Sequence, residues 1–133
     1  MTRLLLAALL AAAVAPAAWR AGAARVNITP KESIWLAGYG ARTKPSEGVL
    51  QDIYAKALAL QNDGAPPAVL VTSDLLGFTR AMSDTVAAAC ERKYGLSRDR
   101  LVLNASHTHS APVTGQLLRP AYALPDPQAA VIR

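Results

Sequence analysis

Two histidines separated by one residue, His107 and His109, are the side chains best suited to chemistry in this chain of 133 residues, and it has no others. They follow an apolar segment, residues 101–105, that has the character of a buried strand. In an extended backbone, side chains alternate between two faces, so both imidazoles are expected to point the same way and to address one metal ion or one substrate. This segment is therefore a candidate reaction centre.

A zinc ion is one group that such a pair can bind, because neutral imidazole is a common zinc ligand. A catalytic zinc site usually takes three protein ligands and keeps one position open, so two histidines are not enough. Asp74 is a candidate to complete the site, to orient an imidazole through a hydrogen bond, or to cap the following helix. The alternative is two loop histidines whose rings are satisfied by backbone groups. Ser106 and Ser110 lie in no Gly-x-Ser-x-Gly elbow, and we interpret them as loop formers or hydrogen-bond donors.

The elements that must position these residues are a strand, a helix and a second strand. The apolar run 68–73 predicts the first strand, and residues 101–105 predict the second. Between them, Thr79 is suited to begin a helix over residues 80–94, which Gly95 ends. A strand–helix–strand connection joins parallel strands by a right-handed crossover, so both strands end at the same edge of the sheet.

Ligands and catalytic groups of open α/β sheets gather at this carboxyl edge. Asp74 follows the first of the two strands, and His107 follows the second. The topology therefore places the aspartate and the histidines in one neighbourhood.

Two further strands complete the predicted sheet. An alternating segment predicts a short strand at 25–29, which Pro30 ends. A strand at 53–61 is separated from the strand at 68–73 by an Asp-Gly turn signal, which predicts an antiparallel pair. The expected fold is α/β, with a mixed sheet and a βαβ crossover.

A glycine-rich loop, residues 34–42, surrounds Tyr39 with Gly38 and Gly40. Glycine permits positive φ and a close approach of another group, so this loop is predicted either to form a tight turn or to press against a neighbouring segment.

The amino terminus has the pattern of a secretory signal peptide over residues 1–23: a basic residue, an apolar run from Leu4 to Ala15, and small residues. The run is too short to span a bilayer comfortably, since a membrane helix needs roughly 20 apolar residues. Two Ala-x-Ala cleavage sites are present, ending at Ala17 and Ala23; the sequence alone does not decide between them, and we favour the second, with a retained amino-terminal anchor as the alternative. We therefore expect residues 24–133 to be exported, to the periplasm or the medium.

Charge and cysteine content argue against two classes of protein, those that bind nucleic acid and those held together by internal disulfides. The formal net charge of +5 falls to +3 when residues 1–23, with their two arginines, are removed. No lysine or arginine cluster interleaved with aromatic residues is present, which argues against a nucleic-acid partner. Cys90 is the single cysteine, so an internal disulfide is excluded and a packing role in the predicted helix is favoured.

Four ordered motifs over residues 24–115 resemble the N-terminal catalytic domain of the neutral/alkaline non-lysosomal ceramidase family. They are ARVNITP from Ala24, LAGYGAR from Leu36, VLVTSDLLGF from Val69 and LVLNASHTHSAP from Leu101. The resemblance implies a secreted or surface hydrolase of sphingolipid metabolism that uses one zinc ion. It departs from the family at Ala111, where a glycine commonly follows the HTHS element, which hints at a divergent subgroup.

The resemblance also implies roles for individual residues. His107 matches a zinc ligand, and His109 matches a catalytic residue close to the substrate. Gly38 and Tyr39 would form part of the pocket wall, and Asp74 would support an imidazole. The family's remaining zinc ligands are another histidine, a glutamate and a tyrosine, all further downstream, so the chain is expected to be the incomplete N-terminal part of a larger hydrolase domain.

The implied function of the longer protein is cleavage of the amide bond of N-acylsphingosine, or of a related lipid amide, by metal-activated water. Such a substrate implies a peripheral contact with a membrane. These 133 residues alone are expected to be inactive, because the metal would lack most of its ligands. The competing hypothesis is an exported, non-catalytic fragment or binding domain without a functional zinc site.

Overall fold

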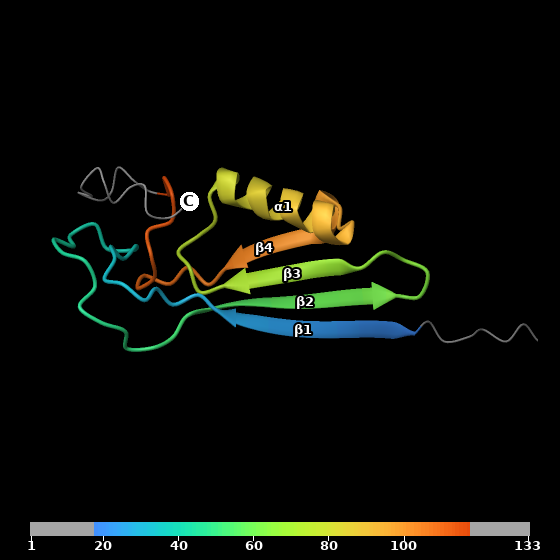
Figure 1. The fold of residues 1–133 in the computed structure, drawn as a ribbon, viewed down its shortest axis with the longest axis horizontal. Helices are drawn as coiled ribbons and strands as arrows, with labels where there is room; N and C mark the ends of the chain where they lie inside the picture. Colours follow the sequence, from blue (N-terminus) through green and yellow to red (C-terminus); the bar gives the residue numbers. More distant parts are fainter. Residues whose placement is uncertain (1–17, 118–133) are drawn as a thin grey trace, which may run out of the picture.

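The computed structural model describes residues 18–117, which form a four-stranded mixed sheet, one α-helix and one turn of 3-10 helix. The elements are β1 (Trp19–Asn27), β2 (Tyr54–Asn62), β3 (Ala68–Ser73), α1 (Arg80–Tyr94), η1 (Arg98–Arg100) and β4 (Leu101–Ala105). The strands lie side by side in the order β1-β2-β3-β4 (Figure 1).

Strand pairing agrees with the predicted mixed sheet. β2 pairs antiparallel with both β1 and β3, whereas β3 and β4 pair in parallel and α1 connects them. The turn after β2 is closed by a hydrogen bond from Ala65 N to the Asn62 carbonyl, 3.0 Å long. Gly64 adopts a φ of 75° in this turn, a conformation that few other residues accept. The Asp-Gly signal thus identified the hairpin, although alanine and leucine in β2 favour helices.

The predicted strand at 25–29 is misplaced, because β1 runs from Trp19 to Asn27. It ends where the Asn27 side-chain oxygen accepts a hydrogen bond from Thr29 N, 2.8 Å away, in a local turn. Every residue of β1 is exposed, so no alternation of buried side chains marks its start. Residues 1–17 of the predicted signal peptide lie outside the described residues, whereas residues 19–23 form the beginning of β1.

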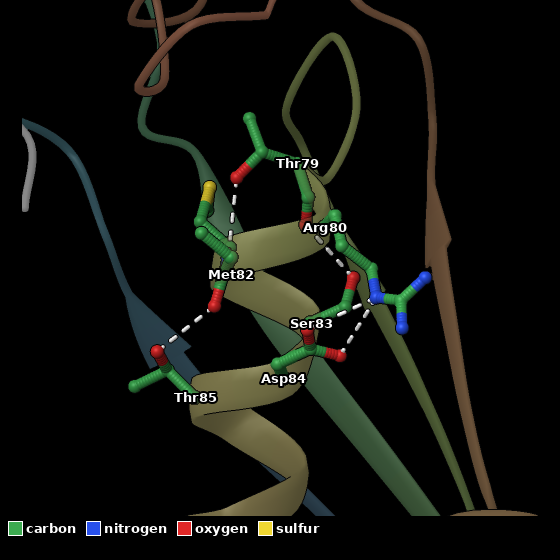
Figure 2. Close-up of polar contacts among 7 residues, drawn as sticks. Thr79, Arg80, Met82, Ser83, Asp84 and Thr85 are labelled. Carbon is green, nitrogen blue, oxygen red and sulfur yellow. Dashed lines mark hydrogen bonds and ion pairs between the residues drawn. The ribbon is translucent and has the colours of Figure 1, made fainter.

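Helix α1 has the predicted bounds and both predicted caps. Figure 2 shows the Thr79 hydroxyl accepting a hydrogen bond from Met82 N, at 3.1 Å. At the other end Gly95, with a φ of 64°, donates its N–H to the Glu91 carbonyl. Both ends therefore pair backbone groups that the helix itself leaves unsatisfied.

Replacing Thr79 with alanine is expected to lower the free energy of unfolding by about 1 kcal/mol, because the helix loses its N-cap acceptor. Thr85→Ala is the matched control, since the Thr85 hydroxyl bonds only to the Ala81 carbonyl within the helix. The control is expected to change stability by less than about 0.5 kcal/mol. Denaturant unfolding of the two variants measures the difference, and equal losses would exclude the cap as its cause.

The main hydrophobic core lies between α1 and one face of the sheet. Ala87 of α1 packs with Leu96 and Leu101, and partly buried side chains of α1, β3 and β4 surround them. These are Val69, Val71, Val86, Cys90 and Leu103. The predicted packing role of Cys90 agrees with its place here.

The opposite face of the sheet is apolar and exposed within residues 18–117. Alternation places Leu58, Leu60, Leu70 and Val102 on that face, and their exposed fractions run from 38% to 56%. No helix in the described part of the chain is long and apolar enough to cross a membrane.

Candidate active site

Three loops meet at the end of the sheet where β3 and β4 terminate (Figure 1). The long connection between β1 and β2 lies against the segment that follows β4. Ala37 N donates to the Ala111 carbonyl at 2.7 Å, and Val113 N donates to the Trp35 carbonyl at 3.1 Å. The loop that precedes α1 is the third. The glycine-rich segment is therefore pressed against the histidine segment, as one of the two sequence interpretations proposed.

A small hydrophobic cluster holds the three loops together. Ala37, Leu76 and Val113, one from each loop, are buried against one another. Trp35 and Leu117 pack around them. Burial of these side chains fixes the backbone from which the histidines project, so the site has a core separate from that under α1.

His107 is positioned by its ring and by its backbone. Its Nδ1 lies 2.9 Å from the Leu76 carbonyl oxygen, which can only accept, so Nδ1 carries the proton. This leaves Nε2 as the ring nitrogen that can bind a metal, the arrangement typical of a metal-binding histidine. His107 also has a φ of 59°, the only positive value at a non-glycine residue among residues 18–117. A left-handed conformation costs about 1–3 kcal/mol and often marks functional positions.

His109 lies beside His107, with ring centroids 5.2 Å apart. The expectation that extended backbone aligns the two rings is wrong, because β4 ends at Ala105 and His107 is left-handed. Tyr39 also contacts His109 edge to face, at 5.1 Å between centroids. The predicted site residues His107, His109 and Tyr39 are thus brought together by turns rather than by strand alternation.

Gly38 provides the space for His109. A Cβ atom at position 38 would lie 2.3 Å from His109 Cβ, far inside van der Waals contact. Gly38 also has a φ of 102°, which side-chain-bearing residues rarely adopt. Its absence of a side chain is therefore a requirement for the observed position of His109.

Arg42 is a site residue that the sequence reasoning missed, although it ends the LAGYGAR motif. Its Nη2 donates to the His109 carbonyl at 2.9 Å, and its guanidinium carbon lies 5.2 Å from the Tyr39 ring centroid. Arg42 therefore ties the glycine-rich loop to the backbone of His109 by a charge-assisted hydrogen bond.

Replacing Arg42 with methionine is expected to destabilise the protein by about 1–2 kcal/mol, because the His109 carbonyl loses a charged donor. The NMR signals of the His109 ring are expected to shift, since Tyr39 and His109 lose their common anchor. Arg80→Met, which removes an exposed ion pair with Asp84, is the control and should leave these signals in place. Unshifted His109 signals in Arg42→Met would contradict this anchoring role.

Asp74 lies at the predicted edge but takes neither of its two proposed hydrogen-bonding roles. Its Oδ2 accepts from Tyr54 N at 2.9 Å and lies 3.8 Å from Lys56 Nζ. Leu76 supplies the acceptor for His107, and Thr79 caps the helix. Asp74 is the first residue after β3, and its carboxylate contacts Tyr54 and Lys56 of β2. Other groups therefore orient His107 and cap the helix.

A cleft of about 660 Å³ lies on the side of the histidine loop where Asp74 is found. Ser106, Thr108 and Ser110 line it, whereas the two histidines that alternate with them do not. The loop therefore presents hydroxyl groups to the cleft and imidazoles elsewhere. The interpretation of the two serines as loop residues accords with this arrangement.

No group of three or more histidine, cysteine or acidic side chains within residues 18–117 is arranged to hold a metal ion. Asp74 does not complete a site with the histidines, given its contacts with β2. His107 fits a zinc ion as one nitrogen ligand through Nε2, because its Nδ1 is already bound to a carbonyl.

Comparison with solved structures finds a similar fold in neutral ceramidases. The structure of neutral ceramidase from Pseudomonas aeruginosa matches over 71% of this chain, with a TM-score of 0.67 and 25% sequence identity. A second structure, a ceramidase complexed with C2, matches over 84% of the chain, with a TM-score of 0.72 and 21% identity. The chain spans 16% and 18% of those two proteins. No protein-family model matches the sequence.

Proposed function

We propose that this chain contributes part of the catalytic site of a zinc-dependent hydrolase of the neutral ceramidase type. The site acts within a longer protein and cleaves the amide of N-acylsphingosine or a related lipid amide. One observation carries the proposal: the left-handed His107 donates Nδ1–H to the Leu76 carbonyl and leaves Nε2 available as a ligand. The likeness in fold to neutral ceramidases supports it.

We assign each side chain a role that its position in the structure supports. His107 holds the metal through Nε2, together with ligands from the longer protein. Zinc, when bound, lowers the pKa of its water to about 7 and polarises a carbonyl. His109, adjacent to His107, donates a hydrogen bond to the substrate oxygen on which negative charge develops. Tyr39, packed on His109, forms one wall of the substrate pocket beside Gly38.

The longer protein is expected to bind zinc in a 1:1 ratio and to release fatty acid from a short-chain ceramide. Removal of zinc with a chelator should abolish hydrolysis, and added zinc should restore it, because the metal supplies the activated water. Elemental analysis and fatty-acid release measure the two quantities. Residues 1–133 alone should show no hydrolysis, which is the matched control.

Hydrolysis that survives complete removal of the metal would contradict the zinc mechanism. A longer protein with neither stoichiometric zinc nor amide hydrolysis would instead support the non-catalytic alternative.

A further inference from the structure

Residues 19–23 have two incompatible assignments. The signal-peptide pattern allows cleavage after Ala23, which would remove them from the exported protein. In the structure they form the first part of β1 and face residues 58–62 of β2 in a continuous antiparallel register. Only one of these two fates can apply to the mature chain.

Cleavage after Ala23 would shorten β1 from nine residues to the four from Ala24 to Asn27. Residues 58–62 of β2 would then lose their pairing with β1, although residues 58–60 would stay paired with β3. The side of β2 that faces β1 would become an edge with unpaired backbone groups. The ion pair between Arg20 and Asp63, 3.3 Å long, would also disappear. Cleavage after Ala17 removes none of these contacts.

The sequence around the two sites points the same way. The site Ala15-Pro16-Ala17 begins at the last residue of the apolar run and has alanine at both ends, as a cleavage region requires. The site at Ala23 is separated from the run by Trp19 and Arg20, one bulky and one charged. A signal peptide is removed during export, before the exported protein folds. The two sites therefore differ in how much of β1 the mature chain would keep.

We propose that the signal peptide is cleaved after Ala17, so that the mature protein begins at Ala18 and retains the whole of β1. This site lies six residues before the alternative site at Ala23. The proposal concerns export and the first strand alone, and it is independent of the chemistry at the histidines.

The amino-terminal sequence of the exported protein tests this proposal. The full gene product is expressed with its own amino terminus in a bacterial host, and protein is purified from the periplasm or medium. Amino-terminal sequencing is expected to give Ala18-Trp19-Arg20. A mature chain that begins at Ala24, or one that retains Met1, would overturn the proposal.

Two variants make the test specific. Ala17→Leu places a large side chain at the proposed site and is expected to eliminate the Ala18 terminus. Ala23→Leu alters the other site in the same way, at an exposed position of β1, and the Ala18 terminus is expected to persist. An Ala18 terminus in Ala17→Leu, or its loss in Ala23→Leu, would overturn the proposal.

Discussion

Replacing His107 with alanine in the longer protein is expected to lower ceramide hydrolysis by more than about 100-fold. Loss of a group that merely orients a metal ligand typically costs 10–100-fold in metal affinity or activity, and His107 is proposed to be a ligand itself. The zinc content of the purified variant is expected to fall in parallel. Fatty-acid release and elemental analysis measure the two effects.

Ser106→Ala is the matched control for this variant. Ser106 precedes His107 in the same loop, but it lines the cleft that the histidines do not line. Its replacement is expected to leave hydrolysis and zinc content within about twofold of the original values, as for a surface change. Full activity in His107→Ala would exclude His107 from the metal centre.

Replacing Gly38 with alanine is expected to destabilise the protein by about 3 kcal/mol or more. Two costs add at this position: the φ of 102° and the clash of the new Cβ with His109 Cβ at 2.3 Å. The new Cβ would also lie 2.4 Å from His109 Cα, so both the backbone and the ring of His109 must move. We therefore expect its contact with Tyr39 to change and hydrolysis to fall by more than the loss of stability explains. Denaturant unfolding and kcat/KM of the folded fraction measure the two effects.

Two other glycines separate these causes. Gly64 has a φ of 75° with no atom near its Cβ position, so Gly64→Ala tests backbone strain alone and is expected to cost about 1 kcal/mol. At Gly48 neither feature is present, and Gly48→Ala is expected to be neutral or to stabilise by up to about 1 kcal/mol. If Gly38→Ala cost no more than Gly64→Ala, the contact with His109 would not be a constraint.

The parts of the fold that the sequence predicted correctly carry local signals. Thr79 and Gly95 define α1 because each satisfies backbone groups within a few residues of itself. The turn at Gly64 identified the hairpin for the same reason. The start of β1 had no such signal, since all of its residues are exposed and its alanines and glycine also suit a signal peptide.

The sequence predicted that the two histidines lie close together, but it did not predict the geometry that brings them there. His107 and His109 are adjacent, as expected, but the cause is a left-handed turn stabilised by the Leu76 carbonyl, which no local pattern announces. Arg42 acts on a residue 67 positions away in the sequence. Such contacts depend on how the loops pack together at the end of the sheet. This packing is part of the tertiary structure, so local sequence patterns do not predict it.

The most direct test of the proposed centre is a crystal structure of the longer protein with diffraction data on both sides of the zinc absorption edge. An anomalous peak is expected about 2.0–2.1 Å from Nε2 of His107, the usual zinc–nitrogen distance. Nδ1 should remain bonded to the Leu76 carbonyl, as it is in this structure. If the crystallised protein is fully active but has no zinc at His107, or has zinc on Nδ1, the proposed zinc centre is contradicted.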